Sequence, residues 1–180
     1  MQTQQKRLLL LNALGGAAVL ASYAWGFLAR PDSMSALWGG VPESARGFYT
    51  LNMFLAAGGY FLFTPHILLR LRALASGLGP ALEARLFPAL YLAILVPSAL
   101  WLPLTAAMVE SPSAPLWWLI RLDLALVGLG SLGLLAAIWL VRDPAPPRGR
   151  VLASVGLLPF CLQTAVLDAL VWPAYFAAPG

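Results

Sequence analysis

Apolar residues along the chain fall into five long blocks, separated by short stretches that hold most of the charges. The blocks cover residues 8–28, 48–69, 86–109, 117–141 and 151–177. Each block supplies the ~20 apolar residues that a helix needs to cross a hydrocarbon layer ~30 Å thick. Because lipid offers no partner to backbone amides and carbonyls, blocks of this length predict transmembrane helices. We therefore expect one all-α domain, residues 1–180, built as a membrane bundle of about five helices.

The fourth block contains two charged residues near its start, Arg121 and Asp123, but residues 124–141 carry no charge. That uncharged run is close to the shortest length that spans a bilayer, so the block is interpreted as a span. Prolines inside several blocks would break soluble helices, whereas neighbouring spans in a membrane bundle can satisfy the carbonyls that they free. Kinks are predicted near Pro97 and Pro159.

Composition excludes an ordinary soluble domain and several classes of site. Hydrophobic residues make up 61% of the 180 residues and charged residues 10%, with a mean hydropathy of +0.81. Soluble domains carry roughly 25% charged residues. The eleven Lys and Arg residues are scattered between the apolar blocks. They form no patch interleaved with aromatic residues, so no nucleic-acid partner is expected. The single cysteine, Cys161, excludes an internal disulfide and a multi-thiolate metal site.

The first block raises one alternative, a cleavable signal peptide. Lys6 and Arg7 precede the apolar run, and the small residues Ser22 and Ala24 imitate a cleavage site. The apolar run, however, continues to residue 28. We therefore expect the block to be retained as the first span.

Basic residues near the span ends predict the orientation of the bundle. With a cytoplasmic N-terminus, eight basic residues lie on the inner side and three on the outer side. The inner residues are Lys6, Arg7, Arg70, Arg72, Arg85, Arg142, Arg148 and Arg150, and the outer ones are Arg30, Arg46 and Arg121. Cytoplasmic loops carry the excess of Lys and Arg in membrane proteins, so the N-terminus is expected inside and the C-terminus outside. We expect a multi-pass protein of a bacterial inner membrane.

Small residues inside the spans predict close helix contacts. Ala13, Ala17 and Ala21 recur at every fourth position of the first block. The second and fourth blocks contain the small residues Gly58, Gly59, Gly128, Gly130, Ser131 and Gly133. Small residues let the backbones of membrane helices approach closely, so both sets are expected at helix–helix interfaces.

Polar and aromatic residues with possible chemistry gather at the outer ends of the spans. Asp168 lies ~26 Å from the inner end of the last block, at ~1.5 Å per residue, which places its carboxyl group in the outer leaflet. An ionisable residue inside a membrane usually faces the bundle interior and finds a partner there. The candidate ligand-binding residues at this depth are Asp168, Arg121, Asn52, Trp101, Trp172, Tyr49 and, in the loop after the first span, Trp38.

The spacing of the last block predicts which side of it faces inward. Cys161, Thr164, Asp168 and Trp172 share one face of an α-helix, and such a polar stripe points into a bundle. Three interpretations of Asp168 follow. It forms an ion pair with Arg121 that only joins two helices, it belongs to a ligand site, or it takes part in proton or ion movement.

Several kinds of chemistry lack the residues that they require. The spans contain no lysine for a Schiff base, and the chain has a single histidine, which excludes bis-His haem ligation. Motifs of zinc proteases, serine hydrolases and phosphate-binding loops are missing, as are paired carboxylates at helical spacing. We expect no cofactor and no metal, and the pattern favours a protein that is not an enzyme.

Five spans, a short chain, abundant tryptophan and a loop between the first two spans resemble the translocator protein and tryptophan-rich sensory protein family. The resemblance places Trp38 and Pro42 in a capping loop, and residues 159–160 where that family opens its last helix with a Pro-Tyr pair. It implies a five-helix bundle whose cavity takes porphyrins, sterol-like molecules or drug-like ligands. The chain departs from the pattern at Gln163 and Val171, where tryptophan and asparagine stand in the family, and it lacks the Trp-x-Pro-Pro run before the second helix.

Two classes of function remain open at this point. The chain either binds or moves an apolar or amphipathic small molecule (a porphyrin, a sterol-like molecule or a lipid) in a cavity of the outer leaflet, or it is a structural or assembly subunit. In the second class its helix faces dock in a homodimer or onto a larger membrane complex. A hollow lined by Trp101, Asp168 and Asn52 would favour the first class, and lipid-facing stripes of small residues would favour the second.

Overall fold

Helices form nearly all of the computed structural model, which describes residues 3–31, 33–75, 80–140 and 147–176. In chain order the elements are α1 (Thr3–Ala29), α2 (Ser33–Ala36), α3 (Glu43–Ala75), α4 (Pro80–Glu110), α5 (Ala114–Leu140), α6 (Pro147–Cys161), the π-helix η1 (Leu162–Val171) and α7 (Trp172–Tyr175). No strand occurs among the described residues. The expected all-α fold is confirmed.

Five helical stretches are long and apolar enough to cross a membrane, as the sequence predicts. Four of them lie in α1, α3, α4 and α5, and the fifth is continuous through α6, η1 and α7. Most of these helices begin several residues before the predicted apolar blocks, because the polar residues that flank the blocks are helical too. Residues 141 and 177, the last of the fourth and fifth blocks, lie outside the described residues.

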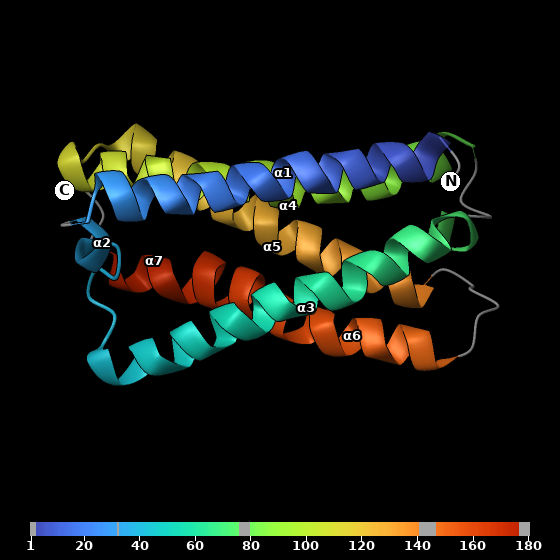
Figure 1. The fold of residues 1–180 in the computed structure, drawn as a ribbon. Helices are drawn as coiled ribbons and strands as arrows, with labels where there is room; N and C mark the ends of the chain where they lie inside the picture. Colours follow the sequence, from blue (N-terminus) through green and yellow to red (C-terminus); the bar gives the residue numbers. More distant parts are fainter. Residues whose placement is uncertain (1–2, 32, 76–79, 141–146, 177–180) are drawn as a thin grey trace.

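The five spans pack mainly as neighbouring pairs (Figure 1). Helix α1 lies along α4, α3 lies along α6, and α5 packs against α4, α6 and η1. Figure 1 shows the chain starting at one end of the bundle and finishing at the other, as an odd number of spans requires. We call the first the N-terminal end and the second, which also holds α2 and α7, the α2 end. Contacts between α1 and α3 are few.

A core of aliphatic and aromatic residues fills the part of the bundle nearer the N-terminal end. Phe63, Phe87 and Tyr91 are fully buried there, and Tyr60 packs edge-on against Phe63 and Tyr91. Two polar contacts join α1 to α3 in this region: Gln5 Nε2 donates to the Leu68 carbonyl at 3.1 Å, and the Tyr60 hydroxyl donates to Asn12. Towards the α2 end α3 diverges from α1 (Figure 1).

Glycines allow the closest helix crossings. A Cβ atom added to Gly59 of α3 would lie 2.2 Å from the carbonyl oxygen of Gly156 in α6, so the two backbones touch. Gly128 meets η1 at Ala165 and Thr164, and Gly130 and Gly133 meet α4. The small residues predicted in the second and fourth spans therefore do serve packing, with one exception: Gly58 faces open space.

The alanine stripe of the first span does not pack inside the chain, so that expectation is wrong. Ala13, Ala17 and Ala21 are exposed on the outer surface of α1. Helix α1 instead approaches α4 through two glycines, because Cβ atoms added to Gly15 and Gly26 would lie 2.7 and 2.3 Å from leucine side chains of α4.

Helices continue through their internal prolines. Helix α3 contains Pro65, and α4 contains Pro88, Pro97 and Pro103. Pro159 lies two residues before the end of α6, where the helix changes to π geometry. The change of helix type after Pro159, which the sequence did not predict, places the side chains that follow in a new register.

Candidate functional site

The last span is not a regular α-helix at the depth of Asp168. From Leu162 to Val171 it is a π-helix, in which residue i bonds to residue i+5 in place of i+4. The wider turn makes residues five apart neighbours, whereas the sequence analysis grouped positions by α-helical spacing. Cys161, Thr164 and Trp172 are buried and Asp168 is partly buried, so the predicted stripe does face inward. Gln163, which α-helical spacing leaves off that stripe, is buried too.

A chain of side-chain amides leads to Asp168. Asn52 of α3 donates through Nδ2 to the Gln163 side-chain oxygen at 3.0 Å and also lies 3.1 Å from the Pro159 carbonyl. Gln163 donates through Nε2 to Asp168 Oδ1 at 2.8 Å. That last contact joins residues five apart and depends on the π-helix. The network fixes the carboxyl group of Asp168 from one side and ties the last span to α3.

Arg121 does not form the ion pair with Asp168 that the sequence suggested. An ion pair at the α2 end joins Arg30 and Glu110, whose charged groups are in direct contact. The Arg121 guanidinium lies 5.9 Å from the centre of the Trp117 ring, one turn earlier on the same helix. Residue counting predicts a depth for each group but not the direction of its side chain around the helix.

Aromatic rings converge from α1, α4, α5 and the last span on the same region. Trp101 lies 6.3 Å from Tyr23 and 6.1 Å from Trp172, measured between ring centres. Trp172 stacks on Phe176 at 4.5 Å and lies 6.2 Å from Trp117. The predicted candidates Asp168, Asn52, Tyr49, Trp101 and Trp172 therefore do face the inside of the bundle.

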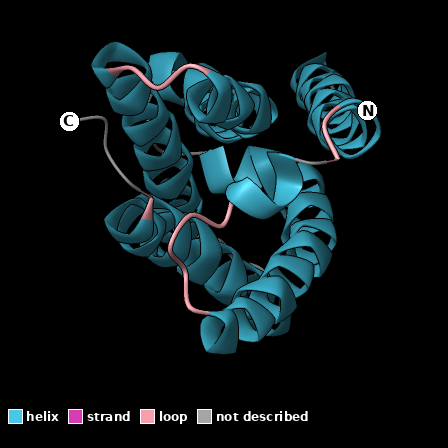
Figure 2. Cartoon of the chain, turned by 90° about the vertical axis from the view of Figure 1, so that its left-hand side faces the viewer, coloured by secondary structure: helices cyan, strands magenta, loops and turns pink. Residues whose placement is uncertain are grey.

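The connection between α1 and α3 covers the α2 end of the last span. The Trp172 indole donates to the Leu37 carbonyl at 2.9 Å, and the Gly40 amide donates to the Tyr175 carbonyl at 2.8 Å. Gly39 has a φ of 54°, a left-handed conformation that favours glycine, and this turn lets the chain approach α7. Figure 2 looks onto this end and shows the connection crossing the helices.

Trp38, the one candidate predicted in a loop, belongs to this connection. Its ring lies 6.1 Å edge-on from Tyr49, and the Arg46 guanidinium lies 5.7 Å from the ring centre. Tyr49 in turn donates to the Leu167 carbonyl of η1 at 3.3 Å. Trp38 thus packs against Tyr49 near the start of α3, beside η1.

Two buried polar atoms in this half of the bundle have no hydrogen-bond partner. They are the indole nitrogen of Trp101 and one carboxyl oxygen of Asp123. Asp123 is only 5% exposed on α5. Natural structures leave few buried polar groups unpaired, since each costs on the order of 1–3 kcal/mol. Both atoms are enclosed and unpaired, so this half of the bundle holds polar groups that its own packing does not satisfy.

We name the residues that converge here the Asp168 site: Asn52, Gln163, Asp168, Tyr23, Tyr49, Trp101 and Trp172. Sequence reasoning missed Gln163 and Tyr23. Only π-helical spacing would have grouped Gln163 with Asp168, and no simple residue pattern predicts a π-helix. Among the described residues, no group of three His, Cys, Asp or Glu side chains is arranged to hold a metal ion.

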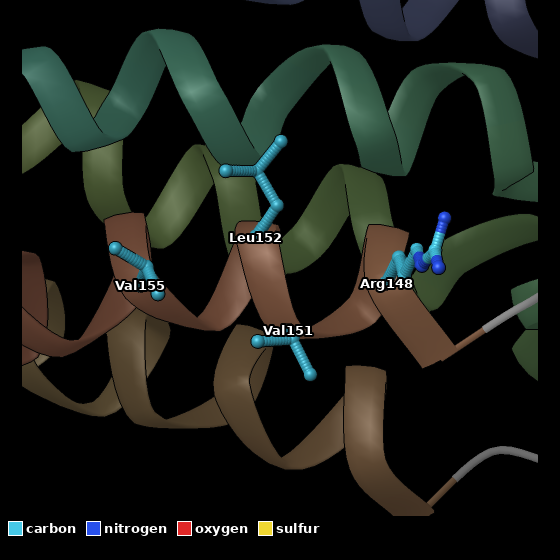
Figure 3. Close-up of a pocket in the computed structure, with 4 residues that line it drawn as sticks. All are labelled: Arg148, Val151, Leu152 and Val155. Carbon is cyan, nitrogen blue, oxygen red and sulfur yellow. The ribbon is translucent and has the colours of Figure 1, made fainter.

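A shallow groove of about 410 Å³ lies elsewhere, at the N-terminal end of the bundle. It follows one face of α6 and is lined by Arg148, Val151, Leu152 and Val155 (Figure 3). All four side chains are exposed on the outside of the helix. The groove therefore belongs to the surface that faces lipid and is separate from the Asp168 site.

Comparisons with known proteins gave no match to a family model, to a curated protein or to a solved structure. The function is therefore argued from the geometry of the site alone.

Proposed function

We propose that this chain binds or moves an apolar or amphipathic small molecule between the helices at the α2 end of the bundle. The observation that carries the proposal is the Asp168 carboxyl group, which lies inside an aromatic region and receives only an amide hydrogen bond from Gln163. Ionisable groups within membrane helices are costly, and those that persist usually serve a ligand or an ion. The aromatic rings suit the apolar body of such a molecule, and Asp168 suits its polar group.

The resemblance to the translocator family supports the same proposal in one respect. The connection after α1 crosses the end of the last span, as a capping loop over a ligand site would. The expected ligands remain porphyrins, sterol-like molecules or lipids.

The orientation belongs to the proposal as well. At the N-terminal end the described side chains include Lys6, Arg7, Arg70, Arg85, Arg148 and Arg150, while Arg30, Arg46 and Arg121 lie towards the α2 end. Arg72 and Arg142 are not described at the side-chain level. This distribution favours an N-terminal end in the cytoplasm of a bacterial cell and a ligand site in the outer leaflet.

Mass spectrometry of the purified protein tests the proposal. The protein is extracted in a mild detergent, and small molecules that remain bound after washing are quantified per mole of chain. Wild type should retain a discrete compound, and Asp168→Asn and Trp101→Leu should each retain several-fold less. Trp118→Leu is the matched control, because Trp118 is 67% exposed on the outside of α5. Equal retention by all four proteins, or none by any, would remove the ligand site.

An assembly subunit is the second candidate, and one observation favours it. The exposed stripe Ala13, Ala17 and Ala21 on α1 has the spacing through which membrane helices dock. If the stripe is an interface, Ala17→Phe should dissociate a complex that the wild-type protein forms in native membranes, as seen by in-membrane crosslinking and gel migration. Ala57→Phe, at an exposed position in the middle of α3, is the matched control.

A further inference from the structure

The carboxyl group of Asp168 has no basic partner within the described part of the chain. Three arginines belong to the α2 end, and each is already engaged. Arg30 pairs with Glu110, the Arg46 guanidinium lies over Trp38 and donates to the Val41 carbonyl at 3.1 Å, and Arg121 lies over Trp117. Among the described residues, the neutral amide of Gln163 is the only group that donates to Asp168. An ionised Asp168 therefore needs a positive charge from outside the chain.

The Asp168 side chain is also not fully enclosed by the chain. Asp168 keeps exposed surface although Gln163 donates to its carboxyl group, whereas Thr164 and Trp172 of the same face are buried. A group from outside the chain can therefore contact the side chain where it is exposed.

The walls beside Asp168 favour a positive charge in a second way. Trp101 and Trp172 lie 6.1 Å apart, with Tyr23 at 6.3 Å from Trp101. The faces of such rings carry partial negative charge and attract cations within ~6 Å, most strongly where water is excluded. A second acid, Asp123, is buried in the same half of the bundle with one oxygen unpaired. Carboxyl groups and aromatic faces both raise the local affinity for a cation.

We infer that the Asp168 site selects an amphipathic organic cation, an amine or quaternary ammonium group on an apolar body, with Asp168 as its counter-ion. This inference rests on the proposed function, because it names the chemical class of the ligand for the same site. The apolar body of the ligand lies against the side chains of Trp101 and Trp172.

A pair of probes with the same shape and different charge separates the two proposals. The cationic probe is a phenylalkyl trimethylammonium ion, and the neutral probe is its tert-butyl isostere. Binding is measured by equilibrium dialysis against wild-type protein in detergent, with Glu43→Gln as the control variant because Glu43 is an exposed acid at the same end. Wild type and Glu43→Gln should bind the cation at least about tenfold more tightly than the isostere.

The variant Asp168→Asn should lose that preference while binding the neutral probe as wild type does, and Asp168→Glu should restore part of it. If wild type binds both probes equally, the site is a ligand site without cation selectivity and the inference is overturned. If wild type binds neither, the proposed function fails with it. A preference that survives in Asp168→Asn would assign the charge to another residue and would also overturn the inference. The comparison of probes on wild type needs no variant and stands even where a substitution prevents folding.

Discussion

The Asn52 side chain links α3 to the last span, and replacing it tests whether these contacts form. Its amide lies within hydrogen-bond distance of both Gln163 and the Pro159 carbonyl. Asn52→Leu keeps the volume and removes both contacts. Hydrogen bonds between membrane helices contribute roughly 0.6 kcal/mol on average and up to about 1.7 kcal/mol. We expect Asn52→Leu to lower the free energy of unfolding in detergent by about 1–2 kcal/mol.

A double-mutant cycle checks the origin of that loss. Gln163→Leu should cost about as much as Asn52→Leu, and the double variant should cost less than the sum by at least about 0.5 kcal/mol, because the two residues share one hydrogen bond. Thr50→Val, an exposed position of α3, should be nearly neutral. Strict additivity of the two leucine variants would show that the amide contact does not form.

The cation–π contact of Arg121 gives a second prediction at this scale. Because its guanidinium lies over Trp117 and not beside Asp168, Arg121→Gln and Trp117→Leu should be coupled by about 0.5–1 kcal/mol in unfolding experiments. Arg121→Gln and Asp168→Asn should instead be additive. If the double variant were instead more stable than the sum of the two losses predicts, Arg121 and Asp168 would form the ion pair that the structure does not show.

Individual residues show how far sequence reasoning reached. Counting ~1.5 Å per residue predicts a depth for each of four candidates, Asp168, Asn52, Trp101 and Trp172. All four side chains are buried or partly buried in the bundle. The side chains that contact Asp168 could not be predicted by counting residues. Its bond to Gln163 requires a π-helix, and the direction of Arg121 depends on how α5 is rotated against its neighbours.

Among the elements, the crossing of α3 and α6 offers the sharpest test because two adjacent glycines differ in their surroundings. A Cβ atom at Gly59 would lie 2.2 Å from the Gly156 carbonyl oxygen, whereas Gly58 has nothing within 4 Å. Gly59→Ala should push the helices apart and cost about 1–3 kcal/mol of unfolding free energy. Gly58→Ala should be neutral or stabilise by up to ~1 kcal/mol, since alanine is the better helix former.

Thermal or denaturant unfolding of both alanine variants in the same detergent measures the difference. Gly156→Ala should resemble Gly59→Ala, because its Cβ atom would lie 2.6 Å from the Gly59 carbonyl oxygen. Equal stability of Gly58→Ala and Gly59→Ala would mean that α3 and α6 do not cross at these glycines.

The spans were predictable as elements because block length alone decides whether a helix can cross lipid. The short helix α2 was not, since four residues leave no periodicity to recognise. The alanine stripe of α1 illustrates another limit. Spacing identifies a surface suited to close contact, but it does not say whether the contact lies inside the chain or outside it, and Ala13, Ala17 and Ala21 are exposed.

At the scale of the whole molecule, the proposed orientation can be checked by labelling. Single cysteines are introduced in a Cys161→Ala background at Ser44 and Ser113, towards the α2 end, and at Ala84, towards the N-terminal end. An impermeant maleimide added to intact cells should label the first two and leave the third unlabelled until the membrane is opened. The reverse pattern would place the α2 end in the cytoplasm.

The number of spans and the placement of the chain ends on opposite sides of the bundle follow from the sequence, because five spans are an odd number. Which helices become neighbours does not follow. The pairing of α1 with α4 and of α3 with α6 depends on side-chain packing between distant segments, and the region around Asp168 is defined by that pairing.

Photolabelling is the most direct measurement of a ligand site at Asp168. An amphipathic cationic probe that carries a diazirine on its apolar part is added to the protein in detergent, and the labelled peptides are identified by mass spectrometry. Label should concentrate on the segments of Tyr23, Trp101 and Trp172 and should fall several-fold in Asp168→Asn. Label spread over exposed residues such as Phe61 and Leu129, unchanged in the variant, would contradict the account, because those side chains lie on the outer surface of the bundle.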